Sequence, residues 1–229
     1  MALIDLSKKE IHCKIVYYGP GRCGKTTNLL YIYNAMSEKT KGKMLTIETK
    51  GERTLFFDLL PLTLGKIGGF DIRIQLYTVP GQALYEATRK LVLKGVDGIV
   101  FVADSLRVRQ MKNKESLEEL KRNLTEYGLS LNKIPLVLQY NKRDLVSSPV
   151  PTISIEELDR DLNNDLGVPR FEAAAIKGIG VFETLKEISK RTVRYVAKKK
   201  HVDKLNGRPV PPMDDQENGN DRHETRRRH

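Results

Sequence analysis

The sequence of 229 residues contains no tryptophan and only two cysteines, Cys13 and Cys23. Two cysteines cannot form a disulfide framework, so the sequence is typical of a protein in a reducing compartment. No apolar run reaches the roughly 18 residues that a membrane-spanning helix requires. The first residues lack the basic and apolar regions and the cleavage site of a signal peptide. We therefore expect a cytoplasmic protein with no transmembrane segment.

Signals for lipid attachment are missing as well. Ala2 stands where N-myristoylation requires glycine, and the sequence does not end in a C-a-a-X motif. We therefore expect any membrane contact to be made through another protein or to be weakly electrostatic. The run Lys198-Lys199-Lys200 is the candidate for such a contact, although it is also typical of a solvated helix end.

Positive charge, in contrast, is in excess. The sequence carries 40 Lys and Arg against 29 Asp and Glu, a formal charge of +11. Between Lys186 and His229, 13 basic residues stand against 7 acidic ones, which places six of the eleven excess charges there. From His201 onward only four of 29 residues are apolar, too few to offset the entropy lost on ordering the chain. The composition predicts one folded domain over residues 1–200 and a disordered, charged tail over residues 201–229.

Strand-like and helix-like patterns alternate over the predicted domain. This alternation is typical of an α/β fold with a mostly parallel central sheet flanked by helices. The predicted strands are Ile11–Tyr18, Lys43–Thr49, Leu55–Leu60, Phe70–Leu76, Gly98–Ala103 and Ile134–Tyr140, with a turn at Gly65–Gly69. The predicted helices are Lys25–Met36, Tyr85–Lys94, Ser116–Tyr127, Ile155–Leu166 and a last one from Val181 to Val196.

A phosphate-binding motif lies between the first predicted strand and the first predicted helix. The segment Gly19-Pro20-Gly21-Arg22-Cys23-Gly24-Lys25-Thr26 matches G-x-x-x-x-G-K-[ST] in the strand–loop–helix context that this motif requires. Loop N–H groups and the helix N-terminus bind phosphate oxygens there, the lysine reaches the outer phosphates, and the threonine hydroxyl ligates Mg²⁺. The predicted phosphate-binding residues are Gly19, Gly21, Arg22, Cys23, Gly24, Lys25, Thr26 and Thr27, with Thr26 also a metal ligand.

A second motif indicates which base is bound. Asn141-Lys142-Arg143-Asp144 follows a predicted strand and has the N-K-x-D pattern of guanine-specific GTPases. The carboxylate of Asp144 can accept hydrogen bonds from N1–H and the exocyclic amine of guanine, whereas adenine has an acceptor at N1 and no amine there. The predicted base-binding residues from this motif are Asn141, Lys142 and Asp144.

A third segment resembles the D-x-x-G-Q switch of Ras-like GTPases. It is Thr78-Val79-Pro80-Gly81-Gln82, in which the N–H of Gly81 would bind the γ-phosphate and Gln82 would orient the attacking water. Thr78 replaces the usual aspartate and brings no negative charge, so metal affinity and the hydrolysis rate are the properties that this replacement affects.

Two further segments complete the predicted site. In Glu52-Arg53-Thr54, Thr54 is the candidate second hydroxyl ligand of Mg²⁺. Arg53 is either an arginine finger that neutralises the transferring phosphoryl group or an ordinary surface arginine. Ala174-Ala175-Ile176 occupies the place of an S-A-K guanine loop, with the N–H of Ala175 directed at guanine O6. The predicted catalytic residues are Lys25, Arg53 and Gln82, and the predicted metal ligands are Thr26 and Thr54.

Together these segments resemble the bacterial MglA family of polarity and gliding-motility GTPases. The resemblance covers residues 1–197 and is carried by the segments that begin at Cys13, Arg53, Leu76 and Leu138. It implies a Ras-like P-loop domain that binds GTP and GDP with Mg²⁺ and hydrolyses GTP slowly without an activating partner. It also implies a Roadblock-domain partner of the MglB type, effectors of cell polarity or motility, and recruitment to a cell pole. Threonine at position 78 is usual in that family.

Two other functions remain open from the sequence. The first is a GTP-binding scaffold in which Thr78 has made hydrolysis negligible. The second is a nucleic-acid or anionic-surface binder that acts through the basic tail, with the GTPase domain as its regulator. Acidic residues interrupt the tail and it has no Phe, Tyr or Trp for base stacking, so we expect no direct contact with DNA or RNA. Cys23 is either a redox-sensitive thiol or a small side chain that fits the loop.

Overall fold

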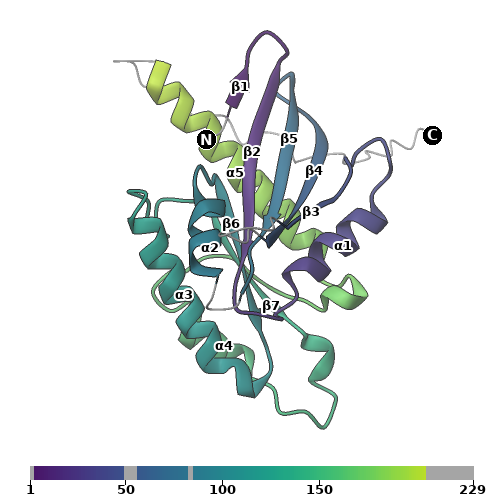
Figure 1. Ribbon diagram of the computed structural model, residues 1–229, viewed down its shortest axis with the longest axis vertical. Helices are drawn as coiled ribbons and strands as arrows, with labels where there is room; N and C mark the ends of the chain where they lie inside the picture. Colours follow the sequence, from purple (N-terminus) through teal and green to yellow (C-terminus); the bar gives the residue numbers. More distant parts are fainter. Residues whose placement is uncertain (1–2, 49–55, 82–84, 205–229) are drawn as a thin grey trace, which may run out of the picture.

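The computed structural model describes residues 3–48, 56–81 and 85–204. An eight-stranded sheet forms the centre of this part of the chain, with helices on both faces (Figure 1). The strands are β1 (Leu3–Asp5), β2 (Glu10–Tyr18), β3 (Leu45–Glu48), β4 (Phe56–Ile67), β5 (Phe70–Thr78), β6 (Gly98–Asp104), β7 (Leu136–Asn141) and β8 (Arg170–Glu172). The α/β class and the mostly parallel sheet predicted from the sequence are confirmed.

The sheet has the order β3-β4-β5-β2-β6-β7-β8, and β1 adds to β2 outside this path. Strands β5, β2, β6, β7 and β8 run parallel to one another. Strands β3 and β4 are antiparallel to their neighbours. The carboxyl ends of β2, β6 and β7 therefore meet at one edge, which is where open α/β sheets bind their ligands.

In the described residues, five α-helices and three 3₁₀ helices lie between or after these strands. The α-helices are α1 (Lys25–Ala35), α2 (Glu86–Leu93), α3 (Gln110–Thr125), α4 (Ile155–Leu162) and α5 (Val181–Lys204). The 3₁₀ helices are η2 (Arg107–Arg109), η3 (Arg143–Leu145) and η4 (Ala175–Lys177). None of the helices in the described residues is long and apolar enough to cross a membrane.

Two hydrophobic cores separate the helices into layers. Ile11, Cys13, Ile15 and Tyr17 alternate along β2 and point into the core that α1 and α5 cover. Val16 and Tyr18 point to the opposite core, which α2, α3 and α4 cover. All seven residues of β6 are buried, as expected for a parallel strand with both faces covered.

The structure corrects several predicted boundaries. Strand β4 continues to Ile67 through a register shift between Thr63 and Lys66, so the turn predicted at Gly65–Gly69 contains only Gly68 and Gly69 outside the strands. Helix α3 begins at Gln110, six residues before its predicted start, because η2 leads directly into it. Strands β1 and β8, which have three residues each, were not predicted.

The ends of the last two helices also differ from the prediction. Helix α4 ends at Leu162 and not at Leu166, because the Asn163 side chain bonds both the N–H and the carbonyl of Val168 and turns the chain there. Helix α5 continues to Lys204, four residues into the segment predicted as a tail. Residues 205–229 lie outside the described part of the chain.

Candidate functional site

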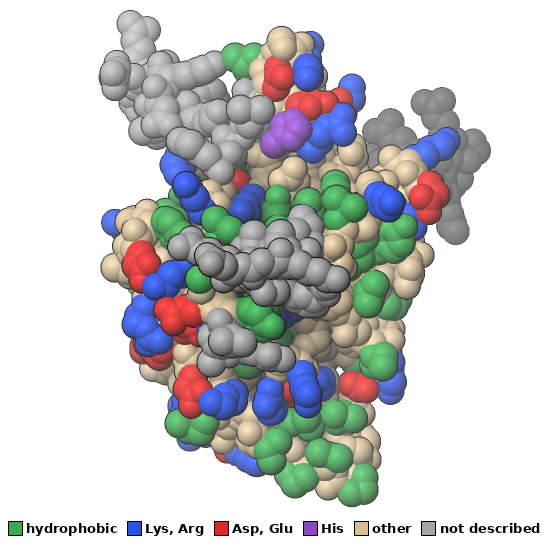
Figure 2. All heavy atoms as spheres, viewed as in Figure 1, with side chains coloured by type: hydrophobic (Ala, Val, Ile, Leu, Met, Phe, Trp, Pro, Cys, Tyr) green, Lys and Arg blue, Asp and Glu red, His purple; other side chains and the backbone are tan. Residues whose placement is uncertain are grey.

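A cavity of about 740 Å³ opens at the carboxyl edge of the parallel strands. Its walls come from the loop between β2 and α1, from the end of β5 and the residues after it, and from α2 and α3. Figure 2 shows several lysine and arginine side chains in the lower part of the molecule, and Arg22, Arg109 and Lys112 are among the residues that line the cavity. The charge of these walls suits an anionic ligand.

The loop from Gly19 to Thr26 requires glycine at two positions. Gly19 has φ of 141°, and a Cβ there would lie 2.2 Å from the carbonyl oxygen of Val102. Gly24 has φ of 101°, and a Cβ there would lie 2.2 Å from Nδ2 of Asn141. The loop is thus packed against β6 and β7 at a distance that only glycine allows. This packing places the N-terminus of α1 at the cavity.

Lys25 is buried at the start of α1. Its Nζ donates to the carbonyl oxygens of Gly19 (2.9 Å) and Pro20 (2.7 Å), and Sγ of Cys23 lies 3.6 Å away. Two carbonyl oxygens of the loop therefore hold the ammonium group of Lys25. Cys23 is fully buried, and burial raises the pKa of its thiol. A buried thiol with a raised pKa is unreactive, which favours the reading of Cys23 as a side chain that fits the loop.

A buried carboxylate lies next to Thr26, and the sequence analysis did not identify it. Asp58 of β4 is 3% exposed. Its Oδ2 accepts hydrogen bonds from the hydroxyls of Thr26 (2.7 Å) and Thr78 (2.9 Å). Its Oδ1 accepts from the hydroxyl of Thr46 (3.0 Å). The backbone N–H of Asp58 donates to Thr78 Oγ1 (3.0 Å), so Thr78 both gives and receives a hydrogen bond with this residue.

Asp58 brings a negative charge next to Thr78, the residue that replaces the usual aspartate. The sequence analysis treated Thr78 as the loss of a negative charge, but the antiparallel pairing of β4 with β5 places a carboxylate against its hydroxyl. Among the described residues, no Lys, Arg or His nitrogen lies within 4.0 Å of the Asp58 carboxylate. A buried carboxylate without a cation is costly. Hydroxyl and carboxylate oxygens are the ligands that Mg²⁺ prefers, so this pair of side chains fits a magnesium ion.

The donor set here is small. Within the part of the chain that the structure describes, no three His, Cys, Asp or Glu side chains gather in a way that could hold a metal. A hydroxyl and one carboxylate leave most positions around Mg²⁺ to water and to phosphate oxygens, which is how magnesium is bound in nucleotide sites.

Gly81 packs directly on the phosphate-binding loop. A Cβ on Gly81 would lie 2.2 Å from the nitrogen of Gly21 and 2.5 Å from the carbonyl carbon of Pro20. The segment after β5 and the loop after β2 are thus in backbone contact across the cavity. This contact places Gly81 against the phosphate-binding loop, and its contact with a γ-phosphate stays a prediction.

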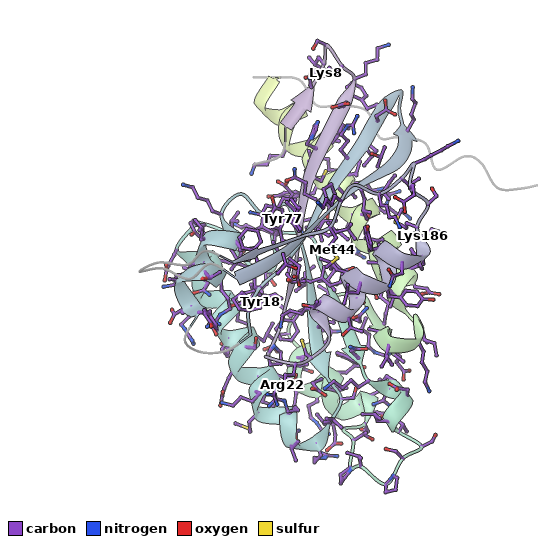
Figure 3. All side chains as sticks on the ribbon, turned by 45° about the vertical axis from the view of Figure 1, so that its right-hand side comes forward. Lys8, Tyr18, Arg22, Met44, Tyr77 and Lys186 are labelled. Carbon is purple, nitrogen blue, oxygen red and sulfur yellow. The ribbon has the colours of Figure 1, made fainter. Side chains whose placement is uncertain are left out.

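A buried polar network holds the residue before Gly81. The guanidinium of Arg89 on α2 donates to the carbonyl of Pro80 (3.0 Å) and pairs with Glu119 on α3. The hydroxyl of Tyr18 also donates to Glu119 (3.1 Å), and Asn123 donates to that hydroxyl (3.2 Å). Tyr18, labelled in Figure 3, carries this network from the end of β2. No sequence pattern indicates this network, because Arg89 occupies one polar position of an amphipathic helix.

Asn141 joins three segments at the other end of the site. Its Nδ2 donates to the carbonyl of Cys23 (2.8 Å), and its Oδ1 accepts from the N–H of Ala175 (2.9 Å). Next to it, Lys142 adopts a left-handed backbone conformation (φ of 67°) and its Nζ pairs with Asp104 (2.6 Å). Asp144 is the middle residue of η3 at the same edge, is half-buried, and its side chain has no hydrogen bond or ion pair with any described residue.

The bond between Asn141 and Ala175 shows what the N–H of Ala175 contacts in this structure. It donates to the amide oxygen of Asn141. Because Asn141 is buried, its oxygen needs a donor, and Ala175 provides it. Ala174 is held by a hydrogen bond from its N–H to the carbonyl of Ile179 (3.0 Å). The loop therefore fixes Asn141, and the predicted contact of the Ala175 N–H with guanine O6 stays a prediction.

Arg109 is another residue that sequence reasoning missed. It lies at the end of η2, its guanidinium donates to the carbonyl of Gly21, and its Nε is 3.8 Å from Asp104. An arginine in this place adds positive charge to the mouth of the cavity. No motif marks it, because η2 follows β6 in a segment with no recognisable pattern.

The remaining predicted residues divide into two groups. Arg22, Thr26 and Thr27 line the cavity, and their roles in binding phosphate and metal stay predictions. Arg53, Thr54 and Gln82 lie outside the described residues, so the catalytic roles of Arg53 and Gln82 and the metal role of Thr54 stay predictions.

Comparison with known proteins identifies relatives of this chain. It matches the family model described as ADP-ribosylation factor family over residues 1–192. It is 55% identical over 198 residues to the mutual gliding-motility protein MglA of Myxococcus xanthus, which is 86% of this chain and 99% of that protein. It is 27% identical over 125 residues to an uncharacterised protein of Methanocaldococcus jannaschii, covering 55% of this chain and 72% of that protein. A Ras-related protein of Arabidopsis thaliana, RABD1, is 26% identical over 140 residues, which is 61% of this chain and 64% of that protein.

Proposed function

This chain belongs to the ADP-ribosylation factor family of small GTPases and is similar to MglA over 86% of its length, and from that premise we propose that it is a GTP-hydrolysing switch that uses magnesium. The family supports a Ras-like switch that binds guanine nucleotide. Our proposal adds the residues: Asn141, Lys142 and Asp144 at the base, the loop from Gly19 to Thr27 at the phosphates, and Gly81 at the γ-phosphate.

The observation that carries the proposal is the Asp58 carboxylate against Thr26 and Thr78. A scaffold that had lost magnesium chemistry would have no need of a buried negative charge at this point. A magnesium ion held beside Thr26 would supply positive charge against the negative charge that develops during phosphoryl transfer. Thr26 and Asp58 would hold it, with Thr54 as the proposed second hydroxyl.

The protein's own groups account for the other parts of the reaction. Lys25 would leave its loop carbonyls to bind the outer phosphates. The N–H of Gly81 would bind the γ-phosphate, and Gln82 would orient the attacking water. Arg53 would act as an arginine finger that neutralises the transferring phosphoryl group.

A single-turnover assay tests this proposal. Purified protein loaded with GTP or with ATP is followed with magnesium and with EDTA, for the wild type and for Gln82→Ala. We expect hydrolysis of GTP only, which EDTA stops and Gln82→Ala slows. A rate at background that does not depend on Gln82 would instead support the nucleotide-locked scaffold.

We further propose that the switch controls cell polarity or motility. The relative from Myxococcus xanthus is named as a gliding-motility protein, and its identity of 55% over 99% of its length supports a similar role. In the proposed cycle the GTP form recruits effectors at a cell pole, and a Roadblock-domain partner of the MglB type accelerates hydrolysis.

Two measurements test this cellular role. Adding a Roadblock partner from the same genome to the single-turnover assay should raise the rate. A pull-down with GTP-locked Gln82→Ala should retain proteins that the GDP form does not. If both nucleotide states retain the same proteins, the proposed switching of partners is wrong.

A further inference from the structure

The excess positive charge of the C-terminal region lies on helix α5 and not on the residues that follow it. Residues 186–200 contain seven Lys or Arg and one Glu. Residues 201–229 contain six Lys or Arg and six Asp or Glu, so they are neutral overall. The feature that the sequence analysis assigned to a basic tail therefore belongs to a folded helix, where its geometry is fixed.

The cations form a stripe along the solvent side of α5. Thr184, Ile188, Thr192 and Val196 are buried against the sheet, which fixes how the helix is rotated. The exposed stripe consists of Lys186, Lys190, Arg191, Arg194, Lys198 and Lys199. Four of its members are spaced four residues apart, so the stripe from Lys186 to Lys198 is about 18 Å long at 1.5 Å per residue. Figure 3 labels Lys186, near the first turns of α5.

Most of this stripe is not neutralised by neighbouring side chains. Arg191 pairs with Glu187 (2.6 Å), and Lys199 lies over the ring of Tyr195 (5.7 Å). Lys186, Lys190, Arg194 and Lys198 have no acidic partner within 4.0 Å among the described residues. Helix α3 differs in this respect, because Lys112, Lys114 and Lys121 each pair with an acidic side chain. The unpaired charge is thus a property of α5 and not of exposed helices in general.

We propose that the α5 stripe is a docking surface for an anionic lipid bilayer. A straight row of lysines and arginines on a half-buried helix fits a plane of phosphate headgroups. Duplex DNA fits less well, because a helix packed along a sheet cannot enter a major groove. Single strands fit less well too, because the aromatic ring beside the stripe, Tyr195, is half-buried and faces Lys199. The attraction needs no inserted apolar segment, and salt weakens it.

Docking through α5 leaves the nucleotide cavity open. Helix α5 lies on the same face of the sheet as α1, whereas α2 and α3, which line the cavity, lie on the opposite face (Figure 1). A bilayer against α5 would thus lie away from the wall that α2 and α3 form. The proposal adds a membrane surface to the GTPase and does not depend on whether GTP is hydrolysed.

Vesicle co-sedimentation of the full chain tests the proposal. We expect binding to phosphatidylcholine vesicles that contain phosphatidylglycerol, no binding to phosphatidylcholine alone, and release at high salt. The triple variant Lys190→Gln, Arg194→Gln, Lys198→Gln should bind about 100-fold more weakly, since each basic residue near an anionic surface contributes about five-fold.

The control carries the same change of charge on the opposite face of the molecule. Lys121→Gln, Arg122→Gln, Lys133→Gln should bind vesicles within about two-fold of the wild type, because α3 and the loop after it do not face the bilayer. Both triple variants should bind guanine nucleotide normally, which shows that they are folded. Equal losses in the two variants would mean attraction by net charge alone and would overturn the proposal. Binding of duplex DNA in place of vesicles, lost in the α5 variant, would also overturn it.

Discussion

The two ends of the proposed nucleotide site, the base end at Asn141 and the metal end at Asp58, are built in different ways. At the base end, Asn141 ties the phosphate-binding loop to the loop at Ala175 with two hydrogen bonds. At the metal end, Asp58 receives three hydroxyl hydrogen bonds from Thr26, Thr46 and Thr78, which come from three different elements. At the base end the buried carboxylate, Asp104, is paired with Lys142 (2.6 Å), whereas the buried Asp58 carboxylate at the metal end has only hydroxyl donors.

This difference shows where each end is sensitive. Neutral buried hydrogen bonds stabilise the loops whether or not ligand is bound. A buried carboxylate without a cation opposes folding until a positive charge arrives. We therefore expect changes at the base end to alter which nucleotide binds, and changes at the metal end to alter how binding depends on magnesium.

The largest effect is expected at the base end. Asp144→Ala should lower GDP affinity about 10³- to 10⁴-fold, because two donors of guanine lose a charged acceptor. Titration with a fluorescent GDP analogue measures this, and preference for GDP over ADP should vanish with it. Asp165→Ala, an exposed site on the loop after α4, should bind GDP as the wild type does. If Asp144→Ala still prefers GDP over ADP, Asp144 does not bind the guanine base and the proposed base end is wrong.

The pair of buried Arg89 and half-buried Glu119 should give the next largest effect. Arg89→Met leaves the Glu119 carboxylate without its cation and should lower the free energy of unfolding by about 2–3 kcal/mol. The double variant Arg89→Met, Glu119→Gln should recover most of this stability in urea unfolding.

The same two variants test the link between Arg89 and Gly81. In both of them the carbonyl of Pro80 has lost its donor, so the preference for a GTP analogue over GDP should stay reduced even where stability returns. If stability and GTP preference recover together in the double variant, Arg89 acts through stability alone.

Removing the Asp58 charge, and then returning a charge at position 78, tests whether this carboxylate holds magnesium. Asp58→Asn should lower magnesium affinity of the nucleotide complex about 10- to 100-fold. It should leave binding in EDTA unchanged, since the base and phosphate contacts remain. Adding Thr78→Asp to Asp58→Asn returns a carboxylate to the neighbouring strand and should restore most of the magnesium dependence. If Asp58→Asn leaves the magnesium titration of fluorescent GDP release unchanged, the two ends of the cavity do not differ in the way we describe.

The smallest effect concerns the outer rim of the base end. The guanidinium of Arg107 hydrogen-bonds Glu157 and lowers the pKa of that carboxyl to about 2, from 4.5 for the free group. A lowered pKa in the folded state means stability that is present above about pH 4.5 and is lost as the pH falls toward 2. The unfolding temperature of Arg107→Gln should therefore lie slightly below that of the wild type at pH 6, and the gap should narrow between pH 4.5 and pH 3. A gap that stays constant with pH would rule out this ion pair as its cause.

The sequence predicted those parts of the site that local segments encode. The loop from Gly19 to Thr26 and the tetrapeptide at Asn141 are contiguous, and each follows its strand as expected. The α/β class followed from alternating apolar patterns. Short elements were missed because β1 and β8 have three residues each, too few for a pattern of period two to be seen.

Asp58 could not be predicted in the same way. It is 20 residues from Thr78 in the chain, and only the register of β4 on β5 brings their side chains together. Register depends on the turn between the strands, and the register shift between Thr63 and Lys66 has no sequence signature. The bond from Ala175 to Asn141 was missed for a related reason, because a loop motif does not show which partner takes each backbone N–H.

The short strand β1 has a consequence for handling the protein. β6 pairs with β2 only from Ile15 to Tyr18, and β1 covers the same edge of β2 from Glu10 to His12. Without β1, a row of main-chain donors and acceptors on β2 would be open to other molecules. A chain shortened to start after this strand would keep every proposed nucleotide-binding residue and would be prone to self-association. Its low yield and its aggregation would then result from the exposed edge of β2 and not from a loss of nucleotide binding.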